Sequence, residues 1–89
     1  MEKEEILLLS FKYFDVTDRI FKNKYRNDYK HLIRYAMVRY GIPFEEIAEV
    51  TNSDRTTTYH SIDFVEKVSS VDKEFKITLD KYLEFLRNH

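Results

Sequence analysis

The sequence predicts an all-α fold, a compact bundle of about five to six helices around a helix-turn-helix. Of the 89 residues one is glycine and one is proline, while 35% are charged, a composition that favours helices over strands. Seven phenylalanines and seven tyrosines supply the apolar area that a small core needs in the absence of cysteine. We therefore expect residues 1–89 to form a single domain.

Two helices are expected at the start of the chain. The first runs from Glu2 to Tyr13, and its acidic start suits the positive end of the helix dipole. Its apolar stripe, which we expect to pack centrally, comprises Leu7, Phe11 and Phe14, widened by Ile6 and Leu9. Asp15 is placed to cap a short second helix, in which Val16 and Ile20 stack four residues apart.

A third helix follows an interruption of the apolar pattern. Asn23 to Asn27 is polar and basic enough to predict a loop. Asp28 is expected to be the N-cap of a helix that extends to Tyr40, and Gly41 is expected to end it, since glycine readily adopts positive φ. The residues of this helix that should face inward are Leu32, Ile33, Ala36, Met37 and Tyr40.

The middle of the chain predicts two helices joined by a tight polar turn. Pro43 suits the first turn of a short helix, and Thr51–Asp54 brings four side chains that favour turns and N-caps. A longer helix, here called the reader helix, follows over about residues 54–68. Its core-facing residues are expected to be Tyr59, Ile62, Val65 and Val68. A last helix is expected from Ser69 or Ser70, with an apolar side formed by Val71, Phe75, Leu79, Tyr82 and Leu86.

Residues Ile47–Glu49 and Asn52–Ile62 resemble the C-terminal DNA-binding domain of DnaA, the bacterial replication initiator. The family's signature runs Leu-Pro-Glu-Ile-Gly, then Gly-Gly-Arg-Asp-His-Thr-Thr-Val-x-His-Ala, and Asp54–His60 repeats its Asp-x-Thr-Thr-x-x-His core. The likeness extends more weakly over nearly the whole chain. The turn is one residue shorter here, and Arg55 stands where the family usually has His. The resemblance implies a Trp-repressor-like helix-turn-helix that binds specific duplex DNA, without the initiator's ATPase domain.

Basic residues are concentrated in one segment of a chain whose net charge is −1. Residues 22–40 carry six lysines and arginines against one aspartate, a net charge of +5. Residues 1–21, 41–60 and 61–89 carry −2, −3 and −1. Because phosphates respond to local charge within a Debye length of about 10 Å, we interpret the segment as a DNA-contacting surface rather than a solvated helix face.

Five residues at the start of the reader helix are candidate DNA contacts. Asp54 is expected to be the N-cap, alone or in a combined role: the resemblance implies that it also faces the major groove, where a carboxylate can accept from cytosine N4. Arg55 can bind guanine O6 and N7, or pair on the surface with Asp54 or Glu49. Thr56 and Thr57 are first-turn residues small enough for close approach, and the family resemblance implies a DNA contact for both. His60 is either a packed, hydrogen-bonded histidine or a phosphate contact.

The basic segment supplies the remaining candidates. The resemblance implies that Lys24 or Arg26 reaches into the minor groove, and we favour Arg26 because narrow minor grooves attract arginine. A role limited to phosphate contact is equally consistent with both residues. Lys30 and Arg34 lie four apart on one helix face, where phosphate contact and solvated support both remain open.

Catalytic and metal-dependent functions find no support in the sequence. A single glycine excludes a Gly-x-x-x-x-Gly-Lys-Ser/Thr nucleotide-binding loop, so neither a nucleotide nor another cofactor is expected. Three histidines without ligand spacing and no cysteine give no metal site, and no spacing assembles a catalytic triad. The start lacks the features of a signal peptide, and no apolar run spans a bilayer, which predicts a cytoplasmic protein.

Two functions follow as hypotheses. The first is a non-enzymatic binder of specific double-stranded DNA, a regulator or accessory protein of replication or transcription. The second is a helix-turn-helix scaffold for protein–protein contact, with Glu45, Glu46 and Glu49 on its surface. Only the first predicts binding to duplexes that depends on both salt and sequence.

Overall fold

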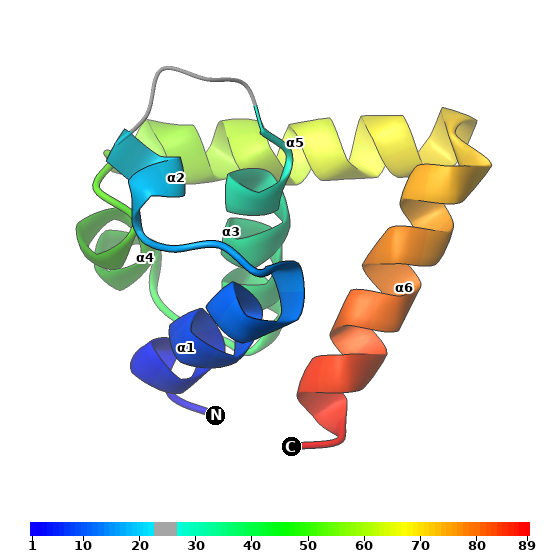
Figure 1. The fold of residues 1–89 in the computed structure, drawn as a ribbon. Coiled ribbons are helices and arrows are strands. Elements are labelled where there is room, and N and C mark those ends of the chain that lie inside the picture. Colours follow the sequence, from blue (N-terminus) through cyan, green and yellow to red (C-terminus); the bar gives the residue numbers. More distant parts are fainter. Residues whose placement is uncertain (23–26) are drawn as a thin grey trace.

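The computed structural model describes residues 1–22 and 27–89, and six helices are present in these ranges (Figure 1). They are α1 (Lys3–Phe14), α2 (Arg19–Lys22), α3 (Tyr29–Arg39), α4 (Phe44–Val50), α5 (Arg55–Val71) and α6 (Lys73–Arg87). The Cα radius of gyration is 12.0 Å, close to the value of about 12 Å expected for a compact domain of this length. The prediction of an all-α bundle is confirmed.

The helices pack around α3, which lies at the centre of the domain. The most extensive helix–helix contact joins α3 to α5, while α1 packs against α3, α4 and α6 (Figure 1). α6 turns back from the end of α5, so that both termini lie at the same end of the molecule. The fully packed core consists of Ile6, Leu32, Ile33, Ala36, Met37, Ile47, Val65, Leu79, Tyr82 and Leu86.

α1 has a polar residue at the centre of its buried side. Ile6 and Ser10 are fully buried, while the predicted residues Leu7, Leu9, Phe11 and Phe14 are half-buried and pack against the core. The Ser10 hydroxyl lies 2.5 Å from the hydroxyl of Tyr82 and also donates to the Ile6 carbonyl, so neither buried hydroxyl lacks a partner. Burial raises the pKa of Tyr82 well above its usual range, which keeps the phenol neutral.

Of two predicted helix caps, the one at Asp15 is wrong and the one at Asp28 is confirmed only in its position. Asp15 does not cap the second helix; with φ of 56° it is the left-handed C-cap of α1, a conformation that aspartate tolerates. Asp28 is the N-cap residue of α3, but its side chain makes no capping bond. The Asn27 Oδ1 atom accepts from the Lys30 N–H instead, at 3.1 Å. Asn and Asp are both good caps, so the sequence did not distinguish between these neighbours.

The predicted end of the third helix is confirmed. Gly41 has φ of +77°, and its N–H donates to the Val38 carbonyl at 3.0 Å. The Ile42 N–H donates to the Met37 carbonyl, also at 3.0 Å, which completes a Schellman motif. This motif reverses the chain into Pro43 and so directs α4 across α3.

The faces of α5 and the start of α6 differ from expectation. Tyr59, predicted to face the core, is 57% exposed, and the fully buried side comprises Thr58, Ser61 and Val65. Ile62, Val68 and Phe75 are half-buried. Neither Ser69 nor Ser70 starts the last helix, because their hydroxyls donate back to α5 carbonyls and α5 continues to Val71. Asp72 caps α6 by accepting from the Phe75 N–H. Val71, predicted to lie on the apolar side of the last helix, is instead the last residue of α5 and is 84% exposed.

Candidate nucleic-acid interface

α4 and α5 form the predicted helix-turn-helix, with the turn at Thr51–Asp54 between them. Asn52 adopts φ of 52°, which asparagine tolerates, and the Ser53 N–H donates to the Ala48 carbonyl at 2.9 Å. The turn is therefore hydrogen-bonded to the end of α4. This bonding fixes the direction in which α5 leaves the turn.

Asp54 is the N-cap of α5, as predicted. Its Oδ1 atom accepts from the Thr57 N–H at 2.9 Å and from the Thr57 hydroxyl at 3.0 Å. These two bonds, the backbone bond first, hold the pKa of Asp54 below its ordinary value, so the carboxylate is charged at neutral pH. Thr57 is consequently half-buried and committed to the cap, while Thr56 is exposed beside it.

Arg55 extends from the first turn of α5 with 61% of its side chain exposed. It pairs at 3.5 Å with Glu45 of α4, whose side chain is 75% exposed, and not with the sequence-predicted partners Asp54 or Glu49. Exposed pairs of this kind contribute about 0–1 kcal/mol, so the pair does not prevent Arg55 from binding elsewhere. No local sequence signal identified this partner, because α4 and α5 meet only in the folded chain.

His60 is exposed one turn further along α5. The interpretation of His60 as a packed, hydrogen-bonded histidine is therefore wrong, and the phosphate contact remains a prediction. Exposed side chains of the first two turns form one surface, here called the α5 start, which consists of Arg55, Thr56, Tyr59 and His60.

Of the basic candidates, Lys30 lies at the start of α3 and is half-buried. Lys24 and Arg26 lie outside the described residues. Arg34 is 3% exposed, so both interpretations offered for it, phosphate contact and solvated support, are wrong. A buried guanidinium in the middle of α3 must instead be satisfied inside the protein.

Arg34 is the centre of a polar network beneath the turn. Its Nε atom donates to the Thr51 hydroxyl at 3.1 Å, Nη1 to the Ser61 hydroxyl at 3.3 Å, and Nη2 to the Thr51 carbonyl at 3.4 Å. The guanidinium carbon lies 5.7 Å from the centre of the Phe21 ring. Arg34 thus joins α3 to the turn and to α5. Sequence reasoning missed this role because an isolated arginine on a basic segment gives no sign of burial.

His31 extends this network toward the surface. Its Nδ1 atom lies 2.8 Å from the Ser61 hydroxyl, and its ring packs on Phe64 with 4.5 Å between the ring centres. Burial, followed by the charges of Arg34 and Lys30, lowers the pKa of His31. A neutral imidazole is therefore favoured at this position.

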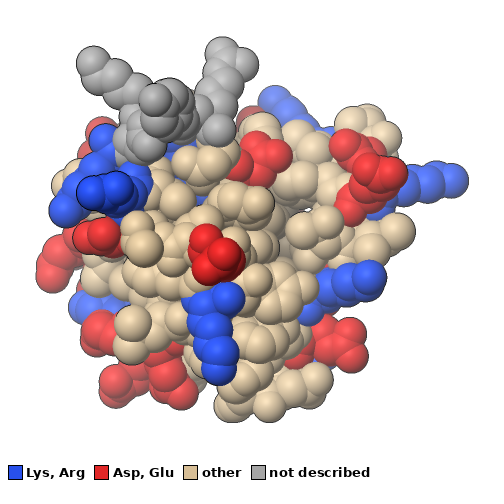
Figure 2. Space-filling view, in the orientation of Figure 1, with Lys and Arg blue, Asp and Glu red and all other residues tan. Residues whose placement is uncertain are grey.

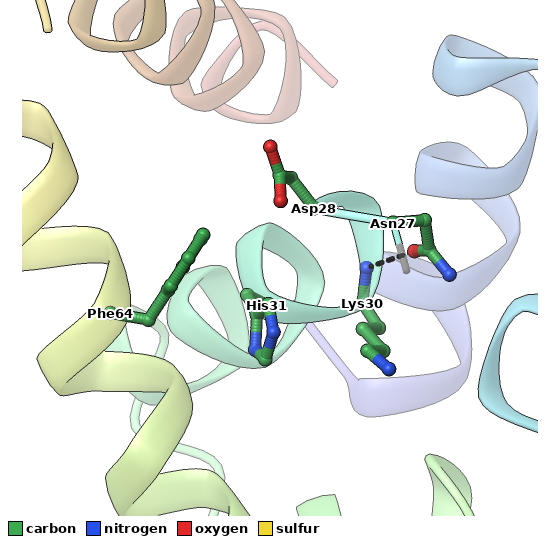
Figure 3. Close-up of a pocket in the computed structure, with 5 residues that line it drawn as sticks. All are labelled: Asn27, Asp28, Lys30, His31 and Phe64. Atoms are coloured by element: carbon green, nitrogen blue, oxygen red, sulfur yellow. Dashed lines mark hydrogen bonds between the residues drawn. The ribbon is translucent and has the colours of Figure 1, made fainter. Parts of the chain in front are cut away.

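A shallow hollow of about 230 Å³ opens beside His31 (Figure 3). Figure 3 shows the His31 and Phe64 side chains on two helices, with the Lys30 to Asn27 bond at the start of α3. The volume of this hollow is below the range of about 300–1,000 Å³ typical of small-molecule sites. The lining residues are Asn27, Asp28, Lys30, His31 and Phe64.

Charges of both signs are interspersed over the face that Figure 2 shows. On α4 the Glu46 carboxylate is bound to Lys3 at 2.8 Å, while Glu45 and Glu49 are exposed near the α5 start. Among residues 1–22 and 27–89, no group of three or more histidines, aspartates or glutamates is placed to hold a metal ion. None of the helices described is both long and apolar enough to cross a bilayer.

No protein-family model, no curated protein and no solved structure matches this chain. The resemblance to the DnaA domain rests on the residues of α4, the turn and α5 named above.

Proposed function

We propose that the chain is a sequence-specific double-stranded DNA-binding domain in which the first two turns of α5 enter the major groove. The observation that carries the proposal is an exposed helix start on a rigid support. Asp54 caps this helix, and Arg34 bonds the turn before it and Ser61 within it. Helix-turn-helix proteins read base edges from the same part of their second helix.

The dimensions of α5 agree with such docking. Its acidic residues restrict contact with DNA to the start of the helix. An α-helix is about 10–12 Å across and the major groove is about 12 Å wide. Asp63 and Glu66 follow on the exposed side of α5, where they would approach phosphates if the helix entered further. Base contacts are therefore assigned to Arg55 and Thr56, with His60 at the phosphates.

Attraction to the phosphates is assigned to the basic residues of segment 22–40 other than the buried Arg34, together with the partial positive charge at the start of α5. The DnaA resemblance supports the same assignment of roles and suggests a regulator of replication or transcription. Such a protein would act in the cytoplasm on the nucleoid. It needs no nucleotide, metal or other cofactor for this function.

Selection from a pool of random duplex DNA, repeated at two salt concentrations, tests the proposal. We expect one enriched sequence, containing a guanine within reach of Arg55, and an affinity that falls as salt rises. Recovery of random sequences at both salt concentrations, with no affinity above background, would refute the proposal.

A second candidate function is a scaffold for protein–protein contact. Glu45 and Glu49 are exposed beside the α5 start, and Arg55 is already paired with Glu45, an arrangement that suits a basic protein partner. Replacing Glu45 by Gln distinguishes the two functions. The variant should bind DNA more tightly if Arg55 reads a base, whereas it should bind a basic protein partner more weakly.

A further inference from the structure

Tyr59 is a large aromatic residue on the exposed side of α5, and 57% of it is accessible to solvent. It follows Arg55 by four residues, so the two side chains lie one above the other on the same face of the helix. The ring packs against Phe44 of α4, with 4.7 Å between the ring centres and 59° between the planes. Tyr59 is thus exposed yet held in one place.

The contact with Phe44 also locates Tyr59 within the helix-turn-helix. Phe44 is the first residue of α4, and its neighbour Glu45 pairs with Arg55 at 3.5 Å. The α5 start therefore has an edge that touches the beginning of α4. In helix-turn-helix complexes the first helix crosses the DNA backbone while the second lies in the groove. The edge next to α4 is consequently the one closest to phosphates.

We propose that Tyr59 donates its hydroxyl hydrogen to a phosphate oxygen where α4 crosses the DNA backbone, an inference that rests on the proposed function. A phenol is a hydrogen-bond donor, and phosphate oxygens accept most protein–DNA hydrogen bonds. Within the described residues the Tyr59 hydroxyl makes no hydrogen bond, so it is free for this contact. Because Phe44 already restricts the ring, docking costs little side-chain entropy.

A phosphate contact by tyrosine differs in two measurable ways from the other contacts assigned to this domain. It carries no base information, so its loss weakens the preferred and a scrambled duplex alike. It is also uncharged and displaces no counterion, so its loss leaves the salt dependence unchanged. A lysine contact would change the salt dependence, and a base contact would affect the preferred duplex alone.

The test is Tyr59→Phe, which keeps the ring on Phe44 and removes only the hydroxyl. Its affinity is measured on the selected and the scrambled duplex over a range of salt. We expect a loss of about tenfold on both duplexes with an unchanged log–log salt slope. Tyr13→Phe is the matched control; Tyr13 is 37% exposed and packs against α6, so affinity should not change.

Each other outcome overturns the inference in a distinct way. Equal affinities of Tyr59→Phe and the wild type would show that Tyr59 only covers Phe44, while DNA binding stands. A loss confined to the selected duplex would assign the hydroxyl to a base edge. A wild-type protein that binds neither duplex would refute the proposed function itself, and the phosphate contact with it.

Discussion

Replacing Arg34 by methionine removes the centre of the polar network beneath the turn while keeping a long side chain. Three terms set the expected change in the free energy of unfolding. The buried Thr51 carbonyl loses its bond from Nη2, which costs about 1–3 kcal/mol, and loss of the Phe21 contact costs about 0.5–2 kcal/mol. Relief of the desolvation of a guanidinium that is 3% exposed acts in the opposite direction. We expect a net loss of about 2–3 kcal/mol.

Urea denaturation followed by circular dichroism measures this change. With a slope of about 1.5 kcal/mol/M, the midpoint should fall by about 1–2 M and the slope should stay constant. Arg39→Met on the same helix is the matched control, because Arg39 is exposed and the change should be within about 0.5 kcal/mol. A variant at position 34 as stable as the wild type would refute the network as a support of the turn. Full rescue by Arg34→Lys would refute the need for the planar fork of donors.

Three further predictions concern the core, pH and the basic segment. Ile33 is fully buried and Ile77 is 52% exposed, so thermal melts should show that Ile33→Ala costs about 2–5 kcal/mol and Ile77→Ala less than about 0.5 kcal/mol. Equal losses would mean that the two faces are misassigned. Because the pKa of His31 is lowered in the folded protein, the unfolded chain becomes protonated at His31 at a higher pH than the folded chain does. The free energy of unfolding should thus fall as pH drops through the ordinary value of 6.5. Unfolding measured at pH 5 and pH 8 should show this difference in the wild type, and the difference should be smaller in His31→Gln. Lys30→Ala should weaken binding to all duplexes and reduce the log–log salt slope by about 0.9, whereas Lys81→Ala on α6 should change neither; equal slopes in both variants would remove Lys30 from the interface.

Apolar periodicity predicted the helices well because each helix buries one side of its own surface. The end of α3 at Gly41 followed from local chemistry, since one residue that adopts positive φ easily is enough to form the cap. Asp15 does not cap α2, and at the start of α3 the capping bond comes from Asn27 and not from Asp28, because several polar neighbours compete for the same backbone groups. Local chemistry alone does not determine which of them wins.

Arg34 and Tyr59 show where periodicity failed. The sequence suggested that Arg34 is exposed and that Tyr59 faces the core, but in the structure Arg34 is buried and Tyr59 is exposed. Arg34 of α3 donates to the buried Ser61 hydroxyl of α5, and an apolar residue at position 34 would leave this hydroxyl without that bond. This exchange depends on a contact between α3 and α5, which no single helix encodes.

The candidate site likewise has some features that the sequence predicted and others that only the fold showed. The cap at Asp54 and the exposure of Arg55 and Thr56 followed from the turn sequence, because they are set by residues within one helical turn. The pair between Arg55 and Glu45 and the packing of Tyr59 on Phe44 join two helices, and they emerged only from the fold. These two contacts are the basis of the Glu45→Gln and Tyr59→Phe variants.

The most direct test of the central claim, that the start of α5 reads duplex DNA, is the affinity of the wild type and Arg55→Ala for two duplexes. One is the duplex obtained by selection and the other is its scrambled counterpart. Arg55→Ala should cost about 1–3 kcal/mol on the selected duplex and much less on the scrambled one, because a bidentate guanine contact exists only on the former. Equal losses on the two duplexes would contradict base reading by Arg55, and unchanged affinities would remove the start of α5 from the interface.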